Sequence, residues 1–143
     1  MFSDYSMSRI VSSLFYSYDD NDIVRVLIGG KTLELVAAKS YMATRKGLGD
    51  RLFIPKDGMI FFFEKNRQLV FWMKDMYFPI DILWISDGKI IGSVENVQPE
   101  KKTPDSKLKK YYSPSDVDIV IELKAGRVKE LGIKINDTIN IER

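Results

Sequence analysis

The stretch GMIFFFEKNRQLVFWMKDMYFPIDILWISDG, residues 58–88, is the most informative part of the sequence. It contains three apolar runs that are typical of strands, with short polar turns between them. Met59 to Phe63 and Leu69 to Met73 are apolar at odd and even positions alike, so we expect paired central strands that are covered on both faces. The third run begins at Ile80 and forms a predicted hairpin with the residues after Asp87-Gly88.

Similar patterns predict the remaining elements. Residues 23–28 and 31–37 flank Gly29-Gly30, a pair that suits a tight hairpin turn. Ser40 can cap a short helix that Gly47 ends. The elements expected after the central stretch are a strand at 117–123, a short helix at 127–131 and a strand pair at 133–141. About eight strands and two or three short helices predict an α+β fold, with a curled, mainly antiparallel β-sheet or a small β-barrel.

The domain organisation is indicated by the length of the chain and by two stretches without a clear strand or helix pattern. At 143 residues the chain is long enough for one core, which we place in a single β-rich domain at 23–143. Residues 1–22 form an appendage whose apolar residues recur at helical spacing, so we expect either a short amphipathic helix or a frayed tail. Residues 97–114 contain three prolines and many lysines, and we expect them to form a long, mobile surface loop.

The composition excludes several classes of function. The sequence has no Cys and no His, so disulfides, zinc fingers and Ser-His-Asp or Cys-His sites are absent. We therefore expect neither a metal nor a cofactor, and any catalysis would use carboxylates, Lys, Tyr or hydroxyl groups. No apolar run approaches the ~20 residues of a membrane span, and the N-terminal residues lack the regions of a signal peptide. We expect a cytoplasmic protein, although a chain without thiols suits any compartment.

Three motifs carry a family resemblance. They are GMIFFF, then FWMKDMYFPIDILWISDGKIIGSVENVQP, then IVIELKAGRVKELGIKINDTINIE. The FWMK motif, followed by a proline and then by Asp-Ile-Leu, is specific, and ELKAG with LGI supports it. On these motifs the chain resembles the bacterial and archaeal family called domain of unknown function 192, over residues 33 to 142. The resemblance implies a compact β-rich domain and no particular reaction.

Several positions differ from the pattern of that family. Gly49 stands where members usually carry methionine, whereas the arginine that follows is retained as Arg51, which makes it a candidate site residue. Asp75-Met76 replaces an Asn-Thr pair, so the polar side chains of that pair are missing here. Lysines occupy the long loop where members often have paired cysteines. Asn136 replaces a glycine, and asparagine tolerates the left-handed conformation of a turn.

Asp81 is the most notable candidate residue. On a strand that begins at Ile80, its side chain shares a face with apolar residues, so it must be hydrogen-bonded or paired. It is either a ligand contact or general base, or a structural carboxylate that accepts N–H groups from the DMYFP turn, and we favour the structural role. Lys74 ends the preceding strand, where it can pair with Asp81, contact a ligand or remain solvated. Glu95 and Asp81 would form a carboxylate pair of the glycosidase kind only at a suitable separation.

Aromatic residues complete the set of candidates. Trp72 and Trp84 can form the floor of a pocket for a flat or sugar-like ligand, and Tyr77 and Phe78 can add to it. Aromatic side chains in strands nevertheless belong more often to the core, because each buries a large area. The candidate ligand-binding residues are therefore Trp72, Lys74, Asp81, Arg51 and Glu95.

The long loop carries the excess positive charge of the chain. It holds five lysines against Glu100 and Asp105, a net +3, whereas the remaining residues hold 17 basic and 18 acidic side chains, or −1. With Tyr111-Tyr112 it can contact an anionic partner. A solvated loop is the simpler interpretation, because no basic face accompanies it on the strands. We do not expect a nucleic-acid partner.

Two classes of function remain, and a third stays open. We prefer a non-catalytic domain that binds an unknown small molecule or peptide in an aromatic cleft near Trp72, Lys74 and Asp81, since β-rich barrels often hold ligands without chemistry. The alternative is a hydrolase or lyase that works by carboxylates, with or without a hard metal ion such as Mg²⁺. The third is an oligomerisation or interaction domain, which would require the MIFFF strand to lie at an exposed edge.

Overall fold

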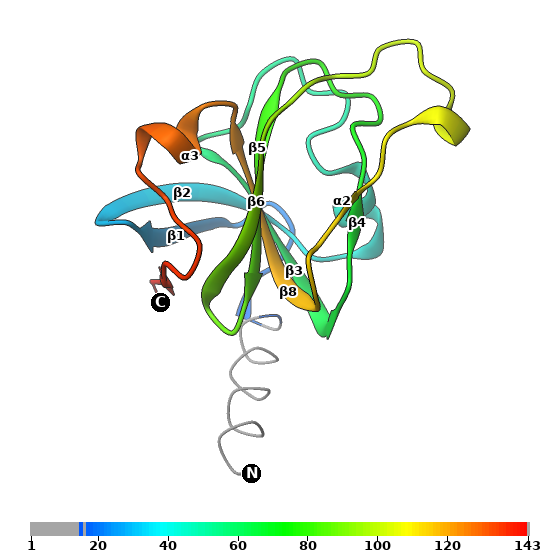
Figure 1. Ribbon diagram of the computed structural model, residues 1–143. Helices are drawn as coiled ribbons and strands as arrows, with labels where there is room; N and C mark the ends of the chain where they lie inside the picture. Colours follow the sequence, from blue (N-terminus) through cyan, green and yellow to red (C-terminus); the bar gives the residue numbers. More distant parts are fainter. Residues whose placement is uncertain (1–14, 16, 143) are drawn as a thin grey trace.

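The computed structural model describes residue 15 and residues 17–142, except for the side chain of Lys65. In this part of the chain a curled sheet forms most of the fold, and two short helices and a small second sheet pack on it (Figure 1). The strands are β1 (Ile23–Ile28), β2 (Lys31–Ala38), β3 (Gly58–Arg67), β4 (Val70–Phe71), β5 (Ile80–Ser86), β6 (Lys89–Val97), β7 (Tyr111–Tyr112), β8 (Val117–Lys124) and β9 (Ile139–Ile141). The helices are α2 (Tyr41–Lys46) and α3 (Arg127–Glu130), with one 3₁₀ turn, η1 (Asp105–Lys107). Most of the appendage predicted at 1–22 lies outside the described residues.

The main sheet has seven strands in the order β6-β5-β8-β3-β2-β1-β9. The β2–β3 pair is parallel, and the other neighbours are antiparallel. The two edge strands approach each other at one end, where Lys89 and Thr138 form an isolated bridge and Ile139 N–H donates to Gly88 O at 2.9 Å. The predicted α+β fold with a curled, mainly antiparallel sheet is therefore confirmed.

Both tight hairpins form at the predicted residues. β1 pairs with β2, and β5 pairs with β6. Gly29 and Gly30 have φ of 57° and 77°, and Asp87 and Gly88 have φ of 52° and 71°. Two consecutive left-handed residues are typical of a type I′ turn, whose twist matches that of the flanking strands.

β3 is buried on both faces because a separate core packs against each side of the sheet. Ile60 and Phe62 belong to the inner core, which the curl encloses and α3 helps to cover. Met59 and Phe61 belong to the outer core, which lies under α2 and the segment that carries β4 (Figure 1). The prediction of a central strand with two covered faces is confirmed for residues 59–62, and Phe63 is partly buried.

The hairpin predicted between 59–63 and 69–73 is wrong. β3 is hydrogen-bonded to β2 along one edge and to β8 along the other, so no edge is free for residues 69–73. Only Val70–Phe71 of that run form a strand, β4, which pairs with β7 in a separate two-stranded sheet. Leu69 and Met73 are buried in the outer core. The apolar pattern therefore indicated burial correctly but not the pairing partner.

The strand pair predicted at 133–141 is also wrong. β9 pairs with β1. The residues before β9 form a turn, in which Lys134 N–H donates to Asp137 Oδ2 at 2.8 Å and Asn136 has φ of 77°. The same turn bonds to the backbone of Ile90, so it joins the edges of the sheet instead of forming a hairpin.

The loop at 97–114 is attached to the outer face near its end. Leu108 is buried, and β7 pairs with β4. Buried Ser113 accepts a hydrogen bond from Leu69 N–H at 2.9 Å and donates one to Ser115 O at 2.7 Å. Most of the preceding residues are exposed. The loop therefore has a fixed end at 108–113 and an exposed part before it.

We predict that a lysine-directed protease cleaves the native protein first after Lys101 or Lys102. Both side chains are exposed and precede the attached end of the loop. Exposed loop tips are the preferred sites of limited proteolysis. Mass spectrometry of the earliest fragments tests this, and initial cleavage within 124–134 would contradict it.

Candidate functional site

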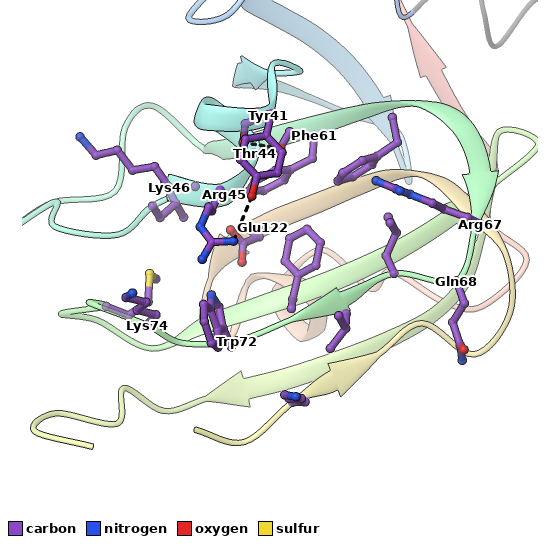
Figure 2. A pocket seen from close by; sticks show the side chains of 18 residues that line it. Tyr41, Thr44, Arg45, Lys46, Phe61, Arg67, Gln68, Trp72, Lys74 and Glu122 are labelled. Atoms are coloured by element: carbon purple, nitrogen blue, oxygen red, sulfur yellow. Dashed lines mark hydrogen bonds between the residues drawn. The ribbon is translucent and has the colours of Figure 1, made fainter. Parts of the chain in front are cut away.

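A pocket of about 530 Å³ opens on the outer face of the sheet. It is enclosed by α2, by β3 and β8, and by the segment 67–76 that carries β4 (Figure 2). The side chains of α2 lie on one side, and Trp72 and Lys74 lie on the other. α2 is fixed at both ends: Ser40 Oγ accepts a hydrogen bond from Ala43 N–H at 3.1 Å, and Gly47 ends the helix with φ of 51°.

Aromatic rings form one wall of the pocket. The half-buried Phe71 makes edge contacts with Phe61 at 5.0 Å and with Phe63 at 6.4 Å between ring centroids. It also contacts Trp84, which is buried in the core, at 5.6 Å. Edge-to-face packing holds these rings in place, so the wall has a fixed shape.

Glu122 lies deep in this pocket. It belongs to β8, opposite Met59 in β3 and Ile82 in β5, and its neighbours Ile121 and Leu123 face the inner core. Glu122 is only 5% exposed, yet it lines the pocket. Within the described part of the chain, no hydrogen bond or ion pair involves its carboxyl group. A buried carboxyl group without a partner is uncommon, because its desolvation is not compensated.

Burial raises the pKa of Glu122 to about 8. Burial removes most of the water from the carboxylate, and no cation or N–H group of the described residues bonds to it, so the neutral acid is favoured. Gly47 leaves space beside this carboxyl group, because a Cβ at that position would lie 3.2 Å from the Phe61 ring and 3.7 Å from Glu122 Oε1. At neutral pH the group is therefore mostly a neutral carboxyl, which can donate one hydrogen bond and accept others.

We predict that ionisation of Glu122 destabilises the fold. Its pKa of about 8 in the folded protein lies above the ordinary value of 4.5, so the folded state binds this proton more tightly than the unfolded chain. Stability should fall as the pH rises from about 4.5 through about 8. Glu122→Gln should then be about 4 kcal/mol more stable than the wild type at about pH 9 and within about 1 kcal/mol of it at about pH 5. Urea unfolding at both pH values measures this, and the same pH dependence in both proteins would contradict it.

Asp118 provides a matched control for Glu122. It lies four residues earlier in β8, is 2% exposed, and its Oδ1 has no hydrogen-bond partner among the described residues. Burial and then the nearby charge of Asp87 raise the pKa of Asp118 to about 6. Asp118 does not line the pocket. Asp118→Asn therefore removes a buried carboxyl group from the same strand without changing the pocket.

The comparisons with known proteins bear on the fold around this pocket. The family model DUF192, described as "Uncharacterized ACR", matches residues 24–141. The chain belongs to this family. A solved structure described as a "putative transcription regulator" from Sinorhizobium meliloti 1021 is 31% identical, with a TM-score of 0.74 over 87% of this chain and 98% of that chain. A protein of unknown function from Novosphingobium aromaticivorans DSM 12444 is 23% identical, with a TM-score of 0.73 over 82% and 84% of the two chains, and shows the fold alone. No curated protein matches the sequence.

Two of the five candidate residues in this DUF192 protein lie at the pocket. Trp72 and Lys74 both line it, and Lys74 Nζ lies 5.5 Å above the centre of the Trp72 ring. Pairing with Asp81, one of the three alternatives for Lys74, does not occur. Lys74 instead lies 2.9 Å from Asp105 Oδ2 in the long loop, because Asp81 points to the opposite face of the sheet.

Asp81 is held entirely by backbone N–H groups. Its side chain is fully buried, Oδ1 accepts from Asn96 N–H at 2.8 Å, and Oδ2 accepts from Gly126 and Val128 N–H at 3.0 Å each. It thus caps the start of α3 from the neighbouring strand, which the N-cap residue Gly126 cannot do for itself. The structural role that we favoured has its partners here, but they come from β6 and α3 and not from the DMYFP turn.

The other candidates lie elsewhere in the fold. Glu95 is exposed on β6, and both oxygens of Asp81 are already occupied, so the two carboxylates do not form a glycosidase-like site. Arg51 is half-buried outside the pocket lining, and its buried Nε has no hydrogen-bond partner within the described residues. Tyr77 is exposed beside Lys101, and Phe78 packs on the outer core.

The sequence-based reasoning missed Glu122. Alternation in 117–123 is typical of a strand with one covered face, a pattern in which Asp118 and Glu122 share the opposite face and do not stand out. Val120 was the available signal, because an apolar residue on that side indicates that it is covered too. A covered face makes Asp118 and Glu122 buried carboxyl groups, which are the informative exceptions in a strand.

The described residues of this DUF192 protein contain no group of three or more Asp or Glu side chains placed to hold a metal ion. None of their helices is long and apolar enough to cross a membrane.

Proposed function

We propose that this protein is a small-molecule-binding domain and that the pocket beneath α2 is its binding site. The observation that carries the proposal is Glu122, which is buried at the pocket and lacks a partner among the described residues. Because this carboxyl group faces the pocket, its free hydrogen-bonding capacity is available to a ligand bound there. Groups arranged for a ligand often carry a cost in stability.

The size and lining of the pocket support the same proposal. Its volume of about 530 Å³ lies in the range of typical ligand sites, which are mostly apolar with a few well-placed polar groups. A flat ligand would lie against the aromatic wall and Trp72, and its inner end would hydrogen-bond to Glu122. Lys74 lies near the outer end of such a ligand.

A thermal-shift screen of small molecules tests this proposal. A ligand at a hundredfold excess over its Kd adds roughly 2.7 kcal/mol to the stability of the native state. Compounds that raise the melting temperature of the wild type should raise that of Glu122→Gln and of Trp72→Ala much less. They should raise the melting temperature of Asp118→Asn as much as that of the wild type. Equal shifts in all four proteins would place binding outside the pocket and contradict the proposal.

A general-acid enzyme is the second candidate, favoured by the raised pKa of Glu122. A carboxyl group with a pKa of about 8 can donate a proton at neutral pH. Glu122 is, however, the one acidic side chain among the described residues that line the pocket, so the two-carboxylate arrangement of glycosidases is not present. Slow conversion of a bound compound by the wild type, but not by Glu122→Gln, would favour the enzyme over the binding domain.

An interaction domain is less well supported. That function required the MIFFF strand at an exposed edge, whereas Met59 to Phe62 are buried in a strand with neighbours on both sides. The description of the Sinorhizobium meliloti structure raises transcription regulation. α2 and α3 are each flanked by strands or loops, so they do not form a helix-turn-helix pair.

A further inference from the structure

The charged residues that line the pocket are nearly all basic. Arg45, Lys46, Arg67, Lys74 and Lys110 line it, against the single acid Glu122. These cations come from α2, from the end of β3, from the segment after β4 and from the residue before β7, which are distant in sequence. Glu122 is mostly neutral at neutral pH, so no acidic residue of the described lining offsets this positive charge. The one carboxylate paired with these cations is that of Asp105, which bonds to Lys74 from the long loop. Cations gathered around a low-dielectric cleft attract anions.

Four of these cations have no carboxylate partner within the described residues. The exception is Lys74, and none of the other salt bridges of the described chain involves a residue of the pocket. Arg45 lies 6.0 Å from the centre of the Tyr41 ring and donates to its hydroxyl at 3.3 Å, and Arg67 lies 5.9 Å from the centre of the Phe63 ring. A guanidinium that rests on a ring is partly immobilised while its remaining N–H groups stay available for an oxyanion.

We infer that the ligand of this pocket is a small organic anion, with an aromatic or apolar body against the Phe61, Phe71 and Trp72 wall and a carboxylate-type oxyanion toward the unpaired cations of the lining, of which Arg45 and Arg67 lie on opposite sides of the pocket (Figure 2). The inference rests on the proposed function and names its ligand class. The apolar body accounts for the aromatic wall, and the oxyanion accounts for the unpaired cations around it. The neutral carboxyl of Glu122 donates a hydrogen bond to an acceptor on the same molecule.

Binding of an anion should depend on pH through Glu122. The titratable and charged groups that line the pocket with it are Tyr41, Arg45, Lys46, Arg67, Lys74 and Lys110. Lysine, arginine and tyrosine side chains ordinarily titrate near or above about pH 10. Between about pH 7 and pH 9, Glu122 is therefore the group whose charge changes most, and its ionised form both loses its donor and repels the anion.

Three probes of the same shape test the inference: 1-naphthoate, the neutral 1-naphthamide and the cationic 1-naphthylmethylamine. Binding is followed by the NMR signal of the Trp72 indole N–H, which a Trp72→Phe variant assigns. We expect 1-naphthoate to bind about tenfold or more tightly than 1-naphthamide at low salt. We expect this preference to shrink as salt is added, because the four unpaired cations are exposed to solvent.

Two sets of variants sharpen the test. Arg45→Gln with Lys110→Gln should remove most of the preference for 1-naphthoate and leave the affinity for 1-naphthamide unchanged. Lys107→Gln is the matched control, because Lys107 is exposed in the same loop and does not line the pocket. Above about pH 8 the affinity for 1-naphthoate should fall in the wild type and stay constant in Glu122→Gln.

The outcomes separate this inference from the proposed function. Equal affinities for 1-naphthoate and 1-naphthamide at Trp72, or a preference for the amine, would overturn the inference and leave a binding pocket in place. Failure of all three probes to shift the Trp72 signal at about millimolar concentration would count against both.

Discussion

Phe61→Ala should lower the free energy of unfolding by about 3–5 kcal/mol. Phe61 is 1% exposed, and its ring packs edge-on against Phe71 at 5.0 Å. Removing the ring leaves a cavity in the aromatic wall of the pocket, next to Phe71. The neighbouring strands β2 and β8 are hydrogen-bonded to β3 on both sides, so the backbone cannot move inward to fill it.

Urea unfolding with linear extrapolation measures this loss. Phe61→Leu is the matched control, because leucine keeps most of the side-chain volume of phenylalanine. Its loss of stability should be less than about half of that of Phe61→Ala. A loss below ~1 kcal/mol for Phe61→Ala would mean that this strand is not part of a packed core. Such a result would also remove the fixed wall on which the proposed pocket depends.

Asp81→Ala should cost about 3 kcal/mol, because three backbone N–H groups lose their acceptor together. Val128 is buried, so its N–H group cannot turn to water without opening the start of α3. The loss should appear first as increased hydrogen exchange at Gly126 and Val128 and then in the midpoint of urea unfolding.

Asp81→Asn should lose less stability than Asp81→Ala, because its amide oxygen still accepts hydrogen bonds from the N–H groups on one side. Asparagine cannot replace the carboxylate fully, because backbone N–H groups donate to both Oδ1 and Oδ2. The NH₂ group of asparagine is itself a donor, so it would face one of these N–H groups without a hydrogen bond. Lys74→Met is the comparison variant, and its effect should be small because Lys74 pairs with an exposed carboxylate. Unchanged midpoints for both Asp81 variants would contradict the structural role.

Local sequence signals predicted the local structure well. Gly29-Gly30 and Asp87-Gly88 form turns because their backbone conformation is set within two residues. Ser40 and Gly47 likewise fix the ends of α2. The apolar run at 59–63 correctly indicated a strand with two covered faces, since burial on both sides leaves no polar alternation.

Local sequence patterns could not predict which strands pair or which residues form the pocket. The apolar run at 69–73 suggested a neighbour for β3, but the parallel partner β2 arrives from an earlier segment and occupies that edge. Asp81 was identified as a satisfied carboxylate, although its donors lie 15, 45 and 47 residues away and could not be named. Trp72 and Lys74 were candidates because they end an apolar strand-like run, and they line the pocket, whereas Glu122 became notable only once β8 was seen to be covered on both faces.

The most direct test of the account is an NMR titration of the Glu122 side-chain carboxyl carbon, assigned by comparison with Glu122→Gln. A buried carboxyl group in the pocket, without a protein partner, should titrate with a pKa of about 8 in the free protein. A pKa near the ordinary value of 4.5 would show that Glu122 is solvated or paired, and would contradict the central claim that it awaits a ligand.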